Sequence, residues 1–235
     1  MNTSSCSIKE HEAVILAFGR TGARAEQLKQ LIVSDDLQVD ALSYNTPMDQ
    51  VSNINSAKAI IIEIDAPSVF NDGLDLVKKI RRENLGTRIF TVITYPKPFT
   101  KVTCYLAGVD HCVKLPIDHS EKVNFLSMLF QDPEWNAEVK LVLDHARLCL
   151  RGHTEKLEIS YSEMKILDAL INAQEHILSH DEIAKALEWN IKFYDPRALE
   201  KTISRLRGKI KKTYDINAIH SVRGFGYRLC RGVIS

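Results

Sequence analysis

Apolar residues in the first half of the chain alternate between short runs and helical stripes. Residues 59–64 read Ala-Ile-Ile-Ile-Glu-Ile, a run typical of a strand buried on both faces of a parallel sheet. Shorter strand-like runs occupy residues 13–18, 39–44, 88–94 and 111–115. Helical patterns follow at residues 23–33, 48–54, 74–83, 99–107 and 120–130. Five βα units in this order predict a flavodoxin-like, doubly wound (βα)5 domain.

The pattern of the second half is different. Ser160 and Glu163 form a capping-box sequence that opens a helix over residues 161–173. Ser179 and Glu182 open a second, shorter helix. Strand-like residues precede the first helix, so this half predicts an α+β domain.

A third helix, residues 195–212, carries an apolar stripe and a cationic face. Asp195 can cap its first turn, and Pro196 suits its first position because no backbone N–H is needed there. The apolar stripe is Leu199, Ile203, Leu206 and Ile210. A face without acidic residues holds Ala198, Lys201, Thr202, Arg205 and Lys209. Such a helix fits a DNA major groove, where base edges and phosphates accept from Arg and Lys; a solvated basic helix is the alternative.

A glycine-braced turn follows that helix. Arg223 lies between the strand-like residues 219–222 and the sequence Gly224-Phe225-Gly226, after which residues 227–229 resume the strand. Two glycines around an aromatic residue suit a tight β-turn, which presents Arg223 at the tip of a ribbon. A basic helix with a basic ribbon beside it predicts a winged helix.

Residues 138–235 resemble the C-terminal effector domain of the OmpR/PhoB family of bacterial transcription regulators. The resemblance rests on residues 139–150, 159–163, 197–210 and 221–227. It implies a sequence-specific DNA-binding transcription regulator, not an enzyme, without cofactors. Its implied partners are double-stranded promoter DNA in tandem half-sites, a second copy of the chain and RNA polymerase.

The resemblance also implies a role for individual residues. Residues placed at base edges of the major groove are Ala198, Lys201 and Arg205. Candidates for phosphate contacts are Arg197, Thr202, Arg207 and Lys209. Arg223 would enter the adjacent minor groove, and Trp189 lies in a loop that packs near the DNA backbone or meets polymerase.

The first half resembles the receiver domain of response regulators, which phosphorylate themselves on an aspartate. Asp65 aligns with the phosphoacceptor, and Thr94 with the switch residue that ends the fourth strand. Receivers hold Mg²⁺ with several carboxylates because a hard dication must neutralise the developing charge. Here the implied acidic pair is replaced by Phe18-Gly19, and the implied lysine by Leu115, with Lys114 displaced onto the opposite strand face.

These departures predict a degenerate receiver without a metal site and a regulator that works without phosphorylation. Asp65 then caps backbone N–H groups or pairs with Arg20, and Glu63 on the same strand face pairs with a base; a metal site rescued by Glu63 is the alternative. Three rival functions stay open. One is an orthodox response regulator phosphorylated on Asp65, and another is a ligand-gated regulator that uses residues 19–22. The third, an adaptor that binds protein in place of DNA, is weakened by the basic face of the third helix.

Composition and charge agree with a two-domain protein. The 235 residues predict a receiver-like domain over 1–131, a linker over 132–137 and the winged helix over 138–235. From residue 138 onward, 17 Lys and Arg stand against 13 Asp and Glu, so the basic half is the DNA-binding half. Without an apolar span or a signal-peptide pattern, the sequence predicts a cytoplasmic location.

The five cysteines have no metal-ligand spacing, and in the cytoplasm reduced thiols are the simplest interpretation. Cys104 and Cys112 could approach each other if they flank a helix–strand turn; a redox role for them is left open. The resemblance implies dimerisation through residues 99–130. Apolar positions there that could exceed the capacity of the core are Tyr105, Leu106, Val123, Leu126 and Phe130.

Overall fold

The computed structural model describes residues 13–32, 37–51, 54–83, 86–131 and 140–235. Its first part contains a parallel five-stranded sheet with the strand order β2-β1-β3-β4-β5. The strands are β1 (Ala13–Gly19), β2 (Leu37–Ser43), β3 (Ala59–Ile64), β4 (Arg88–Ile93) and β5 (His111–Lys114). All six residues of β3 are buried, as its unbroken apolar run predicted. The predicted flavodoxin-like fold is confirmed.

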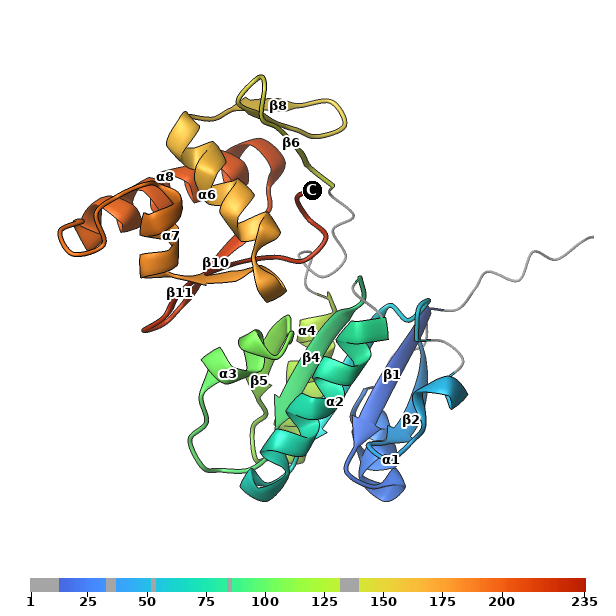
Figure 1. Cartoon of the computed structure of the whole chain (residues 1–235). Helices are drawn as coiled ribbons and strands as arrows, with labels where there is room; N and C mark the ends of the chain where they lie inside the picture. The colour runs from blue at the N-terminus through green and yellow to red at the C-terminus, as the bar shows by residue number, and fades with distance from the viewer. Residues whose placement is uncertain (1–12, 33–36, 52–53, 84–85, 132–139) are drawn as a thin grey trace, which may run out of the picture.

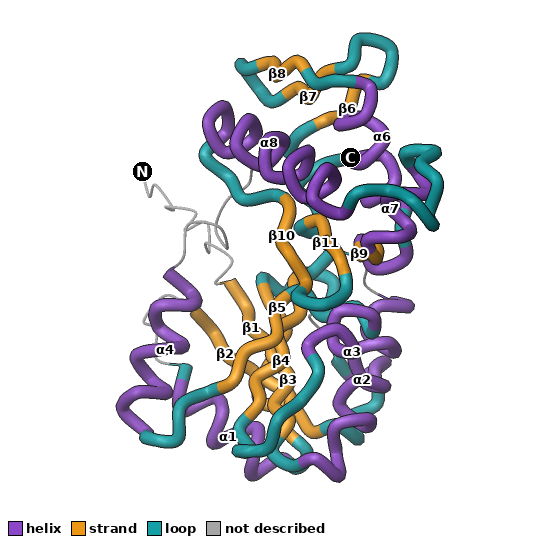
Figure 2. Tube along the Cα trace, turned by 90° about the vertical axis from the view of Figure 1, so that its left-hand side faces the viewer, coloured by secondary structure: helices purple, strands orange, loops and turns teal. Residues whose placement is uncertain are grey.

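Helices cover both faces of this sheet (Figure 2). Helices α1 (Gly22–Leu31) and α4 (His119–Gln131) pack on one face, with Leu28 and Leu126 in their shared core. Helices α2 (Phe70–Glu83) and α3 (Lys101–Leu106) pack on the other, where Val77 and Cys104 are buried. Two short 3-10 turns are η1 (Met48–Gln50) and η2 (Pro67–Val69). The carboxyl ends of β1, β3 and β4 therefore meet at one edge, next to the start of α1.

The weak helix predicted over residues 48–54 is reduced to the single turn η1 in the part of this segment that the structure describes. Met48, Val51 and Ile54 are all buried, and their spacing of three fits a 3-10 turn entering the core as well as it fits an α-helix. The predicted linker, residues 132–137, lies outside the described residues.

The second part is the predicted winged helix (Figure 1). An antiparallel sheet of β6 (Val142–Asp144), β7 (Cys149–Arg151) and β8 (Lys156–Glu158) precedes three helices. These are α6 (Tyr161–Asn172), α7 (His180–Ala186) and α8 (Pro196–Tyr214). The 3-10 turn η3 (Gln174–His176) and strand β9 (Ile177–Ser179) lie between α6 and α7. Strands β10 (Ile219–Val222) and β11 (Gly226–Leu229) form the ribbon of the wing.

The predicted capping box of α6 is present, and α7 begins with a second one. The Ser160 hydroxyl accepts from the Glu163 N–H at 3.3 Å, and Glu163 Oε2 accepts from the Ser160 N–H at 2.7 Å. Ser179 and Glu182 repeat this exchange at the start of α7, at 3.2 Å and 2.7 Å. Two orphan donors are satisfied at each start, which fixes where both helices begin.

Strand β9 is an element that the sequence pattern did not reveal. It pairs with β11 in an antiparallel ladder, with Gly226 opposite Ser179. A Cβ on Gly226 would lie 2.1 Å from the Leu178 carbonyl oxygen, so glycine is required there by close backbone approach. Three residues are too few for a periodic signal, and the tertiary contact alone defines the strand.

No helix among the described residues is long and apolar enough to cross a membrane.

Candidate nucleic-acid interface and receiver site

Helix α8 is held by one face and free on the other. Leu199, Ile203, Leu206 and Ile210 are buried in the core of the winged helix, as the apolar stripe predicted. Asp195 Oδ1 accepts from the Arg197 N–H at 2.9 Å and caps the first turn. The exposed face carries Arg197, Ala198, Lys201 and Arg205. Anchoring by the core leaves this cationic face available for a nucleic-acid groove.

Three other predicted DNA contacts are engaged within the protein. Thr202 Oγ1 donates to the Ala198 carbonyl at 2.9 Å. Arg207 donates to Ser221 Oγ at 2.9 Å and lies 5.2 Å above the Tyr227 ring. This stacking ties α8 to the wing.

Lys209 also has a protein partner. Its Nζ lies 2.8 Å from Glu163 Oε2, so it joins α8 to the capping box of α6. Burial opposes ionisation of this carboxyl, but the hydrogen bond from Lys209 holds the pKa of Glu163 below its usual range. The assignments of Thr202, Arg207 and Lys209 to phosphate contacts stay predictions, and each residue has a structural role besides.

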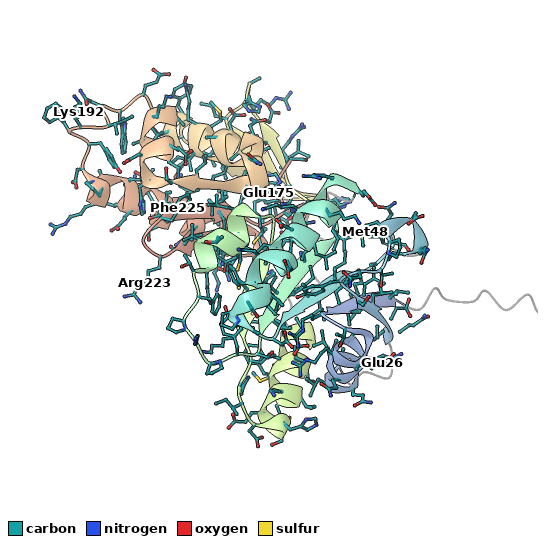
Figure 3. All side chains as sticks on the ribbon, turned by 60° about the horizontal axis from the view of Figure 1, so that its bottom comes forward. Glu26, Met48, Glu175, Lys192, Arg223 and Phe225 are labelled. Carbon is teal, nitrogen blue, oxygen red and sulfur yellow. The ribbon has the colours of Figure 1, made fainter. Side chains whose placement is uncertain are left out.

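The wing presents Arg223 as the glycine pattern predicted. Gly224 has a φ of +73°, a backbone conformation that glycine adopts without strain, and the Phe225 N–H donates to the Val222 carbonyl at 3.0 Å. Arg223 is exposed and points away from the body of the protein (Figure 3). A cation at such a tip can reach a narrow minor groove.

The loop between α7 and α8 carries Trp189. Its ring lies 6.3 Å from that of Tyr194, whose hydroxyl donates to Asp181 Oδ1 at 2.9 Å. A cavity of about 290 Å³ opens here, lined by Trp189, Asn190, Phe193, Tyr194, Asp195 and Ala198. Phe193 is 83% exposed, so the loop offers an aromatic side chain that the fold does not use.

In the receiver-like domain, two arginines surround the carboxylates at the sheet edge. Arg24 Nη2 of α1 lies 2.5 Å from Glu63 Oε1, and Arg24 Nε lies 3.3 Å from Asp65 Oδ2. Arg20 Nη2 is 3.5 Å from the same Asp65 oxygen. The Thr94 hydroxyl donates to Glu63 Oε1 at 3.1 Å. The predicted pairing of Glu63 with a base and of Asp65 with Arg20 is confirmed.

Arg24 was not anticipated, because nothing in the sequence distinguishes it from other solvent-facing arginines of an amphipathic helix. Its guanidinium is the cation that joins Glu63, Asp65 and Thr94. Phe18 and Gly19 supply no carboxylate, so the donor set does not fit the octahedral oxygen shell of Mg²⁺. Within the described ranges, no three His, Cys, Asp or Glu side chains cluster as metal ligands do.

Leu115 and Lys114, at the position of the receiver lysine, point to opposite faces of the strand, as its register predicted. Leu115 is buried in the core, and Lys114 is exposed and donates to the Pro96 carbonyl at 2.7 Å. In the turn over residues 19–22, a Cβ on Gly19 would lie 2.4 Å from the Ala25 nitrogen, so glycine is required at that position by close backbone approach. A cavity of about 290 Å³ lies on the far side of Arg24, between α1 and α4, and reaches Glu63 and Thr94.

An arginine network joins the two domains, and sequence reasoning did not predict it. Arg231, after β11, places Nε 3.3 Å from Asp110 Oδ1 and Nη2 2.6 Å from Glu175 Oε2. The other Asp110 oxygen pairs with Arg81 of α2. These side chains are largely buried, and Glu175 lies where the domains meet (Figure 3). Charged pairs in such surroundings fix orientation because breaking one leaves an uncompensated charge.

A cation–π contact lies beside this network. The Arg228 guanidinium of β11 is 4.8 Å from the centre of the Tyr105 ring of α3. His111 stacks on Phe90 at 4.8 Å, and burial, followed by the nearby charge of Arg228, lowers its pKa to about 4. The His111 ring is therefore neutral at physiological pH.

Comparisons with known proteins agree with this architecture. Residues 154–229 match the family described as "Transcriptional regulatory protein, C terminal". The C-terminal domain of the nisin resistance regulator NsrR is 30% identical; the match covers 38% of this chain and 90% of that one, with a TM-score of 0.33. The chain belongs to the OmpR/PhoB-type transcriptional regulators.

Full-length relatives extend the similarity to the first domain of this regulator. The transcriptional regulatory protein PcoR of Escherichia coli is 24% identical over 208 residues, which cover 86% of this chain and 91% of that protein. PhoP of Escherichia coli strain K12 is 24% identical over 205 residues, covering 85% and 91%. Both are named as transcriptional regulatory proteins.

The predicted dimerisation residues are only partly on the surface. Leu126 is fully buried, and Tyr105 lies under Arg228, so neither provides a free apolar surface. Leu106 is 49% exposed. Exposed apolar residues on the β5–α4 side are instead Ile117, at 89%, and Met128, at 72%. Val123 packs against the core, and the side chain of Phe130 lies outside the described part of the chain.

Replacing Arg24 with methionine should destabilise the protein by about 1–3 kcal/mol, the cost of a buried polar group without its partner. Burial already raises the pKa of Glu63, and Arg24 is the largest influence that lowers it. When the pKa of a carboxyl group is higher in the folded than in the unfolded protein, the folded protein loses stability as pH rises from the unfolded-state pKa through the folded-state pKa. The loss should therefore be larger at about pH 7.5 than at about pH 5.

Urea-induced unfolding of the full chain measures this difference. The matched control is Arg24→Met combined with Glu63→Gln, which has no carboxyl group at position 63. In this double variant, the loss of unfolding free energy should no longer depend on pH. An equal loss from Arg24→Met at both pH values would show that Glu63 is not held ionised by Arg24.

Proposed function

We propose that this regulator is a sequence-specific DNA-binding transcription factor that binds its sites without phosphorylation. The observation that carries the proposal is the Arg24 guanidinium between Glu63 and Asp65, 2.5 Å and 3.3 Å from their oxygens. It places a permanent cation from the chain itself at the sheet edge, where the phosphoacceptor and its metal site would have to operate.

Electrostatics explain why this arrangement opposes phosphoryl transfer. Transfer to an aspartate needs a dication that bridges the phosphoryl oxygens and neutralises the charge as it develops. Asp65 is already paired with Arg20 and Arg24, and Thr94 donates to Glu63. Leu115 is buried and Lys114 donates to the Pro96 carbonyl, so neither position supplies a lysine to the carboxylate. The domain thus has the fold of a receiver, but arginines of the same domain neutralise its sheet-edge carboxylates.

The DNA-reading surface consists of the exposed face of α8 and the tip of the wing. We propose that Arg205 donates to base edges, with Lys201 and Ala198 beside it, and that Arg197 contacts phosphate. Arg223 extends into the adjacent minor groove, whose narrow regions attract arginine. The aromatic loop with Trp189 and Phe193 lies at the start of α8, where it can contact the DNA backbone or RNA polymerase. This function places the protein in the bacterial cytoplasm.

Enrichment of random double-stranded DNA by the unphosphorylated full chain tests this function. The protein should select a reproducible motif arranged as tandem half-sites, without acetyl phosphate or a kinase. Arg205→Ala should weaken binding to that motif by about 1–3 kcal/mol, because a bidentate arginine–guanine contact is lost, and should relax one base position per half-site.

Arg197→Ala is the matched control, since Arg197 is also exposed on α8 but is assigned to phosphate. It should weaken specific and random DNA alike and reduce the salt dependence by about one unit of slope. Equal losses on both kinds of DNA for Arg205→Ala would show that the recognition face is misassigned. No enriched motif from the unphosphorylated protein would contradict the proposed function.

We further propose that the regulator forms a homodimer through the β5–α4 side of its first domain, where Ile117 and Met128 are exposed. Sedimentation velocity of the full chain at tens of micromolar should show a dimer, and Ile117→Asp should shift it to monomer because a charge would be buried in the contact. Phe193→Asp is the control, an equally exposed site on the other domain. A monomeric wild type would mean that DNA brings two copies together.

A further inference from the structure

Cys104 and Cys112 lie next to each other in the interior of the first domain. Cys104 is on α3 and Cys112 on β5, and their sulfur atoms are 3.4 Å apart. Both residues are buried, at 0% and 2% exposure. The S–S bond of a disulfide is about 2.0 Å long, so the sulfurs, 3.4 Å apart, would have to approach by about 1.4 Å to bond. The turn between α3 and β5 brings them together, as their positions flanking it suggested.

The surroundings of the two sulfurs favour redox chemistry over metal binding. In the part of the chain that the structure covers, no third His, Cys, Asp or Glu completes a metal cluster with them. The contact between the two sulfur atoms lowers the pKa of Cys112 and, together with burial, raises the pKa of Cys104. The pair is thus asymmetric: Cys112 is the thiol that ionises first, and Cys104 keeps its proton.

We propose that Cys104 and Cys112 form a reversible disulfide, a modification site of this regulator that responds to small hydroperoxides. The Cys112 thiolate attacks one oxygen of hydrogen peroxide, the O–O bond breaks, and the departing hydroxide takes up a proton as water. The Cys104 sulfur then attacks the Cys112 sulfenic acid, and its thiol proton leaves with the hydroxyl as a second water. Two thiols are oxidised by two electrons, and one peroxide is reduced to two waters.

Access for the oxidant comes from the weakness of α3. The helix has six residues, and its N-cap residue, Thr100, makes no side-chain capping hydrogen bond. Short helices depend on tertiary contacts for their stability, so α3 can open locally without unfolding the sheet. One such contact is the stacking of Arg228 on Tyr105, the residue immediately after Cys104.

The site is linked to the contact between the domains through its neighbours in the chain. Tyr105 follows Cys104 and lies under Arg228, and Asp110 precedes Cys112 by two residues and pairs with Arg231. Between them, a Cβ on Gly108 would lie 2.8 Å from Glu175 Oε2, so the turn itself faces the winged helix. Docking of the winged helix holds α3 closed and slows oxidation; by reciprocity, the disulfide alters docking.

Tryptic mapping of the full chain tests the proposal directly. Residues 102–114 follow Lys101, end at Lys114 and contain no other lysine or arginine, so both cysteines fall in one peptide. After treatment with hydrogen peroxide and alkylation, this peptide should be lighter than the reduced peptide by two hydrogens and carry no alkyl group. Dithiothreitol should restore two alkylation sites. Oxidation of the exposed Met128 in the same sample shows that peroxide reached the protein.

Variants test which cysteine reacts with peroxide first and whether docking of the winged helix slows disulfide formation. Cys104→Ser should stop at a sulfenic acid on Cys112 that dimedone traps, whereas Cys230→Ser should leave disulfide formation unchanged. Arg228→Ala should accelerate it about two- to fivefold, the factor that corresponds to a cation–π contact of about 0.5–1 kcal/mol.

Two results would overturn the disulfide, and a third would overturn its link to docking. Retention of two alkylation sites in peptide 102–114 after Met128 is oxidised would exclude the disulfide, as would conversion of either cysteine to sulfinic acid in place of the cross-link. An unchanged rate in Arg228→Ala would exclude the link to docking.

Discussion

The arginine side chain between Glu63 and Asp65 is the interaction on which this account of the regulator depends. A receiver-like sheet brings carboxylates to one edge because the ends of parallel strands meet there, and those charges need a cation nearby. Arg24 supplies it from the first turns of α1, and Thr94 donates to the same Glu63 oxygen. In the proposed function, this cation stands where a receiver would need a metal ion.

The two domains contact each other through charged pairs and ring packing. Asp110 lies between Arg81 of its own domain and Arg231 of the winged helix, and Arg228 stacks on Tyr105 next to it. The same β11 that carries Arg228 pairs with β10 to form the wing. A displacement at the α3–β5 turn can therefore reach the DNA-binding ribbon through one strand.

The sequence predicted features that depend on local pattern. The buried run of β3, the capping boxes of α6 and α7, and the apolar stripe of α8 each follow from spacing within one element, and the structure contains all of them. Strand β9, the Arg24 cluster and the Arg231 network depend on residues that are distant in sequence. The arginines look like ordinary surface charges until the chain is folded, and β9 is too short to be periodic, so the pattern carried no signal for them.

We propose that Arg24 takes the place of metal-dependent phosphorylation, and a chemical mimic of phosphoaspartate tests this replacement. DNA affinity and sedimentation of the full chain are compared with and without beryllofluoride and Mg²⁺, which together imitate a phosphorylated aspartate. The account predicts the same affinity and the same oligomeric state in both conditions. A tenfold tightening of DNA binding, about 1.4 kcal/mol, that disappears in Asp65→Ala would contradict it.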